Sequence, residues 1–264
     1  MRSLFIGAAG LTAGQLQTDV IADNFANVNT VGFKRNRAIF AEQMQRRIDR
    51  STRSLAGVPG SEEPIRLGGG TVVQGIRADQ RPGQLEVTGE PWHMAIEGRG
   101  YFRVGNDDGA VFYTRAGDFR LDGDGRLVTS AGQFLLDDED EIISIPEDAG
   151  TVGISQEGRI TARDDNDLEV ELARLRLARF VNPVGLQSIG GGLLAVTAAS
   201  GAAEILEPGD GGAGSIRQGA LEQSNVNLSE EMAGLIIAQR AFQLAARVVQ
   251  SGDQMLGLAN RIGG

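Results

Sequence analysis

The chain has 264 residues, a formal net charge of −10 and no cysteine. Disulfide bonds and thiolate metal sites are therefore excluded, and the acidic balance repels nucleic-acid phosphates and anionic lipid headgroups. With His93 as the only histidine and Lys34 as the only lysine, little material remains for a catalytic triad, a histidine metal site or a Schiff base. We expect no catalytic residue, no metal, no cofactor and no nucleic-acid partner.

The first segment, residues 3 to about 28, has the apolar spacing of an amphipathic helix. One strip along it contains Leu4, Ala8, Leu11 and Phe25. Polar residues interrupt the apolar run too early for a signal peptide, and no stretch reaches the roughly 20 apolar residues of a membrane span. The sequence therefore predicts a helix at this end and no membrane insertion.

Residues 46–70 combine several arginines with serines, Pro59, Pro64 and a triple glycine, a composition typical of an extended connector. From 71 to 206, short runs of Val, Ile, Leu and Phe alternate with glycine turns, which predicts a β domain with strands such as Met94–Glu97 and Val111–Thr114. A glycine-rich linker at 207–214 then leads to a predicted hairpin over 215–223.

Three motifs in the β region invite a chemical interpretation, and each is better explained as a turn. Asp122-x-Asp124-Gly125 lacks the ligand spacing of a calcium loop. Gly98-Arg99-Gly100 lacks the third glycine and the following helix of a dinucleotide loop. The acidic run at 137–141 could bind cations weakly, but a solvated hairpin is favoured.

The last segment predicts a second helix from about residue 228, with two separate apolar seams. The first seam contains Met232, Leu235, Gln239, Phe242, Ala246, Val249, Asp253 and Leu256. The second contains Ile237, Ala241, Leu244, Val248, Ser251, Met255 and Leu258. Two seams require two neighbours, whereas a helix that only pairs with the first helix and caps the β domain needs one. The second seam therefore indicates self-association, with terminal helices that become ordered on polymerisation.

Together these elements predict an α+β fold, mainly β. Residues 1–45 and 215–264 would form a discontinuous helical core domain, in which two amphipathic helices pair in the manner of a coiled coil. The β-rich region at 71–206 would be an inserted outer domain. The acidic excess lies in the middle while each end is locally neutral, which is typical of ends buried among copies and a middle facing water.

Two segments at opposite ends resemble the signatures of the flagellar basal-body rod and hook family. Residues 21–35 end in Thr30-Val31-Gly32-Phe33-Lys34, and residues 219–227 read Gly-Ala-Leu-Glu-Gln-Ser-Asn-Val-Asn. Segments 95–102 and 113–119 are also similar to the family. Within it, the chain length, the second signature and the 46–66 insertion most resemble the members that form the distal rod. The alternatives are the proximal rod protein F or a short hook protein and, in another class, a secreted β-rich enzyme or carbohydrate-binding domain.

The resemblance implies a structural subunit that polymerises into the rod spanning the periplasm and transmits torque from motor to hook. It implies export by the flagellar type III apparatus without a cleaved signal, and contacts with further copies, proximal rod proteins, hook protein and surrounding ring proteins. The 46–66 insertion would bridge neighbours and keep the tube straight. The seams and signatures together predict a subunit interface formed by Leu4, Ala8, Leu11, Phe25, Asn27, Thr30, Gly32, Phe33, Lys34, Ser224, Asn225, Met232, Leu235, Ile237, Gln239, Phe242, Leu244, Val248, Val249 and Leu256.

Overall fold

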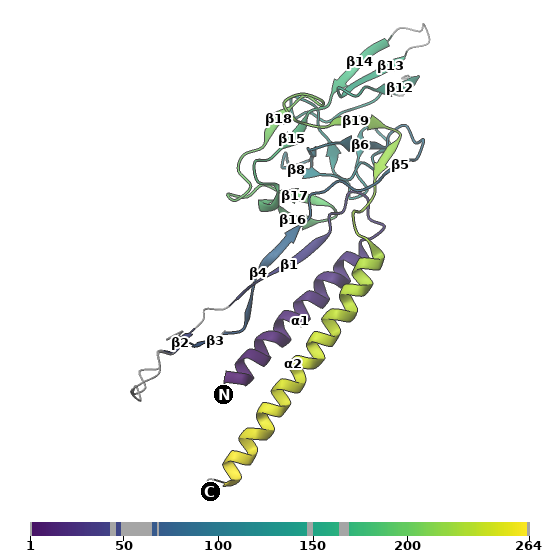
Figure 1. The fold of residues 1–264 in the computed structure, drawn as a ribbon. Helices are drawn as coiled ribbons and strands as arrows, with labels where there is room; N and C mark the ends of the chain where they lie inside the picture. The colour runs from purple at the N-terminus through teal and green to yellow at the C-terminus, as the bar shows by residue number, and fades with distance from the viewer. Residues whose placement is uncertain are drawn as a thin grey trace, which may run out of the picture. The chain divides into compact units, whose positions relative to one another are not determined.

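The computed structural model describes residues 2–42, 46–48, 65–67, 69–146, 150–163 and 169–262, and its elements are shown in Figure 1. The chain divides into two compact units. Unit 1 comprises Met1–Phe25, Asn36–Arg77 and Leu228–Gly264, and unit 2 comprises Ala26–Arg35 and Ala78–Asn227. Each unit therefore combines segments from both ends of the chain.

Unit 1 is built on two antiparallel helices that lie side by side, α1 (Arg2–Ala26) and α2 (Leu228–Ile262) (Figure 1). Glycines of α1 face side chains of α2 at a short distance. A Cβ atom placed on Gly7 would lie 2.6 Å from Val249 Cγ2, and one on Gly14 would lie 3.4 Å from Phe242 Cβ. These glycines let the two backbones approach closely, because any larger side chain would push the helices apart.

The two helices differ in length, with 25 residues in α1 and 35 in α2. The contacts of Gly7 with Val249 and of Gly14 with Phe242 set an antiparallel register. Extending this register by five residues places Arg2 opposite the region of Asp253. The last turns of α2 continue beyond the start of α1 (Figure 1). The end of α2 therefore has no α1 residue beside it.

Unit 1 also contains a β-ribbon, which follows α1 along the chain. Strand β1 (Asn36–Glu42) pairs with β4 (Thr71–Ala78), and β2 (Arg46–Ile48) pairs antiparallel with β3 (Ile65–Leu67). Paired strands thus occupy both ends of the range 46–70, where the sequence predicted an extended connector. Residues 49–64, which carry most of the insertion predicted to bridge neighbours, lie outside the described residues.

Unit 2 is formed by short antiparallel strands. Its largest sheet has the order β16-β17-β8-β7-β11-β10-β9, made of β7 (Phe102–Gly105), β8 (Val111–Thr114), β9 (Arg120–Leu121), β10 (Leu127–Val128), β11 (Phe134–Leu135), β16 (Gln187–Gly190) and β17 (Leu193–Ala195). A second sheet contains β12 (Thr151–Ile154), β13 (Arg159–Arg163) and β14 (Glu169–Arg174). One core fills the space among these strands and includes the buried side chains of Phe102, Phe119, Leu127 and Ile160.

Three strand pairs complete unit 2. They are β15 (Leu177–Arg179) with β18 (Glu204–Leu206), β19 (Ser215–Gln218) with β6 (Met94–Glu97), and β20 (Ala220–Glu222) with β5 (Leu85–Val87). A short 3-10 helix, η1, spans Pro183–Gly185. The predicted hairpin over 215–223 is therefore wrong: β19 and β20 pair with two other strands, and Gly219, at φ 68°, redirects the chain between them.

The observed elements confirm a mixed fold in which strands predominate and a helix lies at each end. Strands β6 and β8 begin and end at the residues predicted for them. Residues 207–214, predicted as a linker, form a turn closed by Gly209 N–H donating to the Gly214 carbonyl at 3.0 Å. The predicted domain boundaries, the coiled-coil character of the helix pair and the inserted outer domain stay predictions.

Candidate functional site

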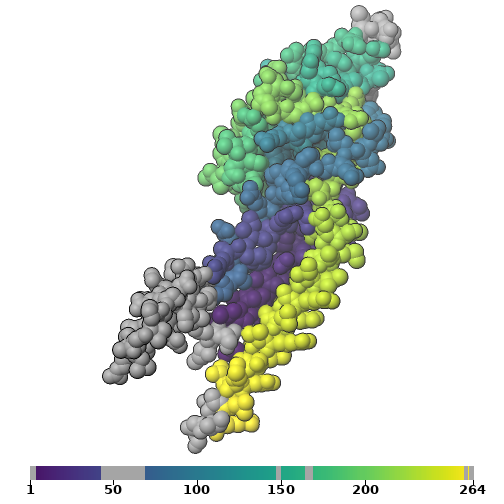
Figure 2. All heavy atoms as spheres, viewed as in Figure 1, coloured from purple at the N-terminus to yellow at the C-terminus, as the bar shows by residue number. Residues whose placement is uncertain are grey.

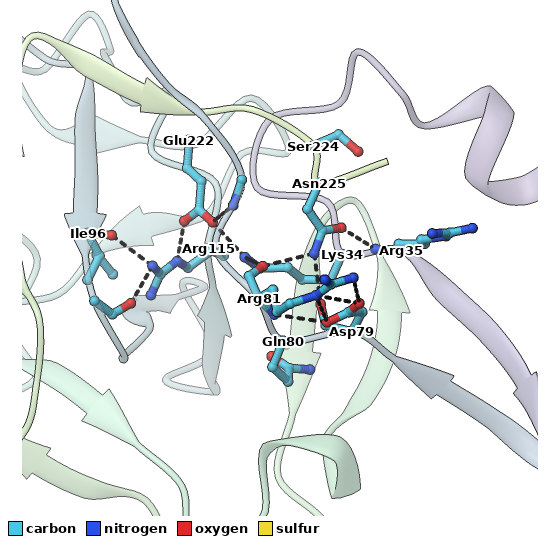
Figure 3. A network of polar contacts seen from close by, with 12 residues as sticks. Lys34, Arg35, Asp79, Gln80, Arg81, Ile96, Arg115, Glu222, Ser224 and Asn225 are labelled. Atoms are coloured by element: carbon cyan, nitrogen blue, oxygen red, sulfur yellow. Dashed lines mark hydrogen bonds and ion pairs between the residues drawn. The ribbon is translucent and has the colours of Figure 1, made fainter. Parts of the chain in front are cut away.

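A buried ion-pair cluster in unit 2 joins residues from both ends of the chain (Figure 3). The Glu222 carboxylate accepts hydrogen bonds from Lys34 Nζ at 2.6 Å and from Arg115 Nε at 2.5 Å. The exposed fractions of these side chains are 1% for Glu222, 7% for Arg115 and 12% for Lys34. One carboxylate thus lies between two cations, away from water.

Arg115 is held on its other side by backbone carbonyls. Its Nη1 donates to Gly100 O at 2.5 Å, and its Nη2 donates to both Ile96 O and Gly98 O at 2.7 Å. The guanidinium group therefore donates from all three of its nitrogen atoms, which a lysine could not reproduce. The arginine ties the end of β6 and the following turn to β20 through Glu222.

The side chain of Asn225 likewise binds backbone groups, here those of the segments around Lys34. Its Oδ1 accepts from Arg35 N at 2.7 Å, and its Nδ2 donates to Asp79 O at 2.9 Å and Arg81 O at 2.8 Å. Lys34 Nζ also donates to Arg81 O, at 3.0 Å. We call Lys34, Arg115, Glu222 and Asn225 the polar clasp.

The backbone of the first signature lies between two other segments of unit 2. Gly32 N–H donates to Glu222 O at 2.7 Å, and Asp79 N–H donates to Arg35 O at 2.8 Å. Gly32 adopts φ 69°, and a Cβ there would lie 2.7 Å from the backbone N of Ala116. Only glycine satisfies both the left-handed conformation and the close approach.

The charges of the clasp shift the pKa values of its members. Burial alone would raise the pKa of Glu222, but the charges and hydrogen bonds of Arg115 and Lys34 outweigh it and lower that pKa. Burial lowers the pKa of Lys34, and the nearby Glu222 offsets this only in part. The positive charge of Arg115 lowers the pKa of Lys34 further. Burial also raises the pKa of the neighbouring Tyr101 to about 12.

Unit 1 contains a second polar junction between the two ends. Asn24 Nδ2 donates to Glu231 Oε2 at 3.3 Å and to Asn36 O at 2.8 Å, while Asn24 Oδ1 accepts from Asn36 N at 2.7 Å. Asn24 and Glu231 are both buried. Residues of the first signature thus contact residues near the second signature in each unit.

The surface of α2 carries a long apolar strip that α1 leaves uncovered. The predicted second seam is exposed in the single chain: Ile237, Leu244, Val248, Met255 and Leu258 have between 47% and 64% of their surface exposed. Figure 2 shows α2 at the surface of unit 1 along most of its length. The described residues of α2 that are buried or half-buried recur close to heptad spacing instead, at Glu231, Gly234, Leu235, Ala238, Ala245, Ala246, Val249 and Gly252.

The structure separates the residues predicted for the subunit interface into two groups. Gly32, Lys34 and Asn225 make the contacts within one chain described above. Most of the helix residues have free surface: Ala8, Phe25, Met232, Ile237, Gln239, Phe242, Leu244, Val248 and Leu256 are exposed, and Leu4, Leu11, Leu235 and Val249 are half-buried. Of the rest, Thr30 is exposed, and Asn27, Phe33 and Ser224 are half-buried. Whether these residues contact other copies stays a prediction.

One expectation from composition needs correction. Among the described residues, one helix segment, Leu228–Leu258, is long and apolar enough to cross a membrane by length and composition. The expectation that no stretch reaches a membrane span is therefore wrong by this criterion: polar residues interrupt the run of consecutive apolar residues, but the mean hydropathy over the helix is high enough. The same apolar surface that suits a helical neighbour also suits lipid by this measure.

Several residues of these junctions were not among the predicted site residues. Glu222, Arg115 and Asn24 lie inside the family-like segments, and Glu231 lies four residues after the last of them. The contacts Asn24–Glu231, Lys34–Glu222 and Arg115–Glu222 each join residues more than a hundred positions apart. The helix-facing glycines Gly7, Gly10 and Gly14 had a usable signal, because their spacing places them on one helix face. That signal points to close helix approach.

In the two acidic motifs of the β region, the acidic residues form hydrogen bonds to neighbouring residues of the same motif. Asp122 Oδ2 accepts from Arg126 Nε at 2.8 Å, and its Oδ1 accepts from the backbone of Asp124 at 2.9 Å. In the 137–141 run, Asp137 N–H donates to Glu141 O at 3.0 Å. Both motifs form turns, in agreement with the favoured interpretation.

Three protein-family models match the chain. The model described as "Flagella basal body rod protein" matches residues 4–34, "Flagellar hook protein FlgE/F/G D1 domain" matches 95–162, and "Flagellar basal body rod FlgEFG protein C-terminal" matches 217–262. The first match ends at Lys34 and the last contains Glu222 and Asn225. The clasp therefore joins the two terminal family regions.

Curated relatives match over nearly their whole length. The flagellar basal-body rod protein FlgG of Borreliella burgdorferi is 40% identical, covering 99% of this chain and 98% of the relative. FlgG of Bacillus subtilis is 36% identical, covering 97% of each chain. A second protein of Bacillus subtilis, the flagellar hook-basal body complex protein FlhP, is 30% identical over 99% of each chain.

Proposed function

Because the chain belongs to the FlgG family of flagellar basal-body rod proteins, we propose that it polymerises into the distal rod through the apolar faces of its terminal helices. Membership of this family makes the chain a structural subunit of the basal-body rod. The proposal assigns no catalytic step to it. The greater identity to FlgG than to FlhP of the same bacterium favours the distal rod over another position in the basal body.

The exposed strip on α2 is the observation that carries the proposal. The strip runs from Ile237 to Leu258 on the side of the helix that α1 does not cover. Full burial of a Val, Leu, Ile or Met side chain contributes about 1.5–3 kcal/mol. Packing the strip against α1 or α2 of another copy would remove its apolar surface from water and give each helix the second neighbour that two seams require.

A bilayer fits this strip less well than a second copy does. Arg240, Arg247 and Asp253 lie on α2 among the apolar residues and are exposed. A charged side chain at the centre of a bilayer costs several kcal/mol, whereas in a helical assembly it can face a water-filled space or an oppositely charged neighbour. We therefore assign the strip to contacts between copies.

The subunit would be exported by the flagellar type III apparatus without a cleaved signal. In the assembled rod it would lie among further copies, with proximal rod proteins below, hook protein above and ring proteins around it. The helix pairs would form the wall of the tube, and the β structure of unit 2 would make lateral contacts that resist twisting. The polymer would act as the drive shaft that transmits torque from motor to hook.

A pair of neighbouring substitutions on α2 tests the proposal. Leu244→Glu places a charge on the apolar strip, and Gln243→Glu places the same charge one residue away, on the polar side of the helix. We expect Leu244→Glu to abolish rod-like polymers in electron micrographs of purified protein and Gln243→Glu to retain them. The unfolding of unit 2, followed by the fluorescence of Trp92, serves as the folding control. Normal polymers from the Leu244→Glu chain would refute the assignment.

A further inference from the structure

We propose that the polar clasp is a one-way latch: residues 26–35 dock on the rest of unit 2 only after residues 215–225 have completed its β structure. Ordering of the first signature, and of the helix end directly before it, then depends on the C-terminal segment, while the C-terminal segment does not depend on the first signature. This dependence goes beyond the proposed rod function. It concerns the order in which one subunit acquires its structure.

The receiving side of the latch is complete without residues 26–35. Strands β19 and β20 pair with β6 and β5, and Ile216 and Ala220 are buried against them. Arg115 holds three carbonyls and the Glu222 carboxylate, none of which belongs to the first signature. The site that accepts Lys34 is therefore built from groups that stay in place when the first signature is absent.

Residues 26–35, which form the docking side of the latch, depend on the C-terminal signature for most of their contacts. The two hydrophobic clusters of unit 2, as far as the structure describes them, take no buried residue from 26–35. The segment is held mainly by polar contacts to the C-terminal signature: Gly32 N–H to Glu222 O, Lys34 Nζ to Glu222 Oε1, and Arg35 N–H to Asn225 Oδ1. Without Glu222 and Asn225, Lys34 would lose its buried carboxylate and the backbone of Arg35 its acceptor.

The cost of burying an unpaired charge explains why the first signature depends on the C-terminal segment and not the reverse. A buried cation without a counterion is strongly unfavourable, so the first signature cannot occupy its place before Glu222 arrives. Glu222 already has Arg115 as a counterion, so β20 can form before Lys34 arrives. The docked segment starts at Ala26, where α1 ends, and so provides one anchor of that helix.

Lys34 offers a built-in reporter because it is the only lysine in the chain. A lysine-specific endoprotease has a single cleavage site, the bond between Lys34 and Arg35, and it can cut there only when the latch opens. Dilute full-length protein is incubated with the protease, and the two fragments are quantified on a gel. We expect slow cleavage of the native chain.

The variant Asn225→Ala removes the acceptor of Arg35 N–H and two hydrogen bonds to the carbonyls of Asp79 and Arg81, without removing a buried charge or a core side chain. We expect it to be cleaved at least about tenfold faster than the native chain. The matched control is Glu86→Gln on β5, whose exposed side chain accepts a hydrogen bond from Gln223 Nε2 at 2.6 Å, and it should be cleaved at the native rate. Equal rates for Asn225→Ala and the native chain would overturn the proposal.

The direction of the dependence is tested on the cleaved chain. Trp92, the only tryptophan, lies against the core of unit 2 and reports its unfolding by fluorescence. We expect the urea midpoint of this transition to change little after cleavage at Lys34, because β19, β20 and Arg115 keep their partners. Loss of the cooperative transition on cleavage would show that unit 2 depends on the first signature, contrary to the one-way latch.

Discussion

The side-chain amide of Asn24 donates a hydrogen bond to the carboxylate of Glu231, which joins α1 to α2 across 207 positions of the sequence. Both side chains are buried, and Asn24 also exchanges two hydrogen bonds with the backbone of Asn36. A polar pair in an otherwise apolar helix contact is satisfied in one alignment of the helices only. Asn24 therefore specifies the register in which the glycines of α1 face α2.

Gly7→Leu and Gly257→Leu form a matched test of that helix contact. A Cβ on Gly7 meets Val249 at 2.6 Å, whereas one on Gly257 meets no atom within 4 Å in the single chain. We expect Gly7→Leu to separate the helices and lower the temperature at which assembled polymers dissociate, measured by light scattering. Gly257→Leu should favour the helix by about 0.5–1 kcal/mol, as removal of a helical glycine does. A lower dissociation temperature for Gly257→Leu would instead locate a neighbouring copy at this position.

Gly32→Ala and Gly89→Ala separate backbone conformation from close contact. Both glycines have positive φ, 69° and 76°, but only Gly32 lies against other backbone atoms. Gly89→Ala should cost about 1–2 kcal/mol, the strain of a left-handed residue. Gly32→Ala should cost more than that, because the backbone of Arg115 and Ala116 must also move. The loss at Gly89 is measured by urea unfolding monitored at Trp92, and the loss at Gly32, which lies in the docked segment, is measured by the faster cleavage at Lys34. Equal losses would contradict the close approach at Gly32.

The fork of Arg115 predicts that a lysine cannot replace it. Arg115→Lys keeps the charge opposite Glu222 but loses most of the hydrogen bonds to the carbonyls of Gly100, Ile96 and Gly98. We expect unit 2 to lose about 2 kcal/mol or more of unfolding free energy. Arg217→Lys, at an exposed ion pair with Glu97, should change it by less than about 0.5 kcal/mol. Similar effects of the two substitutions would mean that the Arg115 fork contributes little.

The ion-paired carboxylate of Glu222 should make part of the free energy of unfolding depend on pH, and acid should remove that part. Its pKa in the folded chain is lowered below the ordinary value of 4.5, so the folded state binds a proton less readily than the unfolded state. The stabilisation is complete above that ordinary value and is lost as the pH falls through the lowered pKa. Urea unfolding of the native chain and of Glu222→Gln should therefore show a steeper acid loss for the native chain. Parallel pH profiles would exclude the ion-paired carboxylate as the cause.

The sequence was sufficient for the terminal helices, for several strands of unit 2 and for the family, because these depend on local pattern. Helix periodicity located α1 and α2 to within a few residues, and glycine turns between apolar runs located β6 and β8. Pairing was harder to predict. Ser215–Gln218 and Ala220–Glu222 are adjacent and β-like, so a hairpin was the natural inference, yet each pairs with a strand more than a hundred positions earlier.

The clasp was inaccessible to pattern analysis for the same reason. Lys34 and Glu222 are 188 positions apart, and neither spacing nor composition indicates that they meet. The second apolar seam, in contrast, follows from helical periodicity alone, and the structure leaves it exposed in the single chain. Local regularities were predictable, whereas contacts between the two ends required the three-dimensional structure.

The unequal lengths of the two helices give the pair a blunt end and a protruding end. Beyond Asp253 the nine residues from Gln254 to Ile262 extend α2 by about 13 Å past the start of α1, and they carry Met255, Leu256 and Leu258. If copies stack end to end, inverting one pair would set its protruding end against that of its neighbour. The unequal helix lengths of a single subunit would thus favour head-to-tail stacking, in which every copy points the same way.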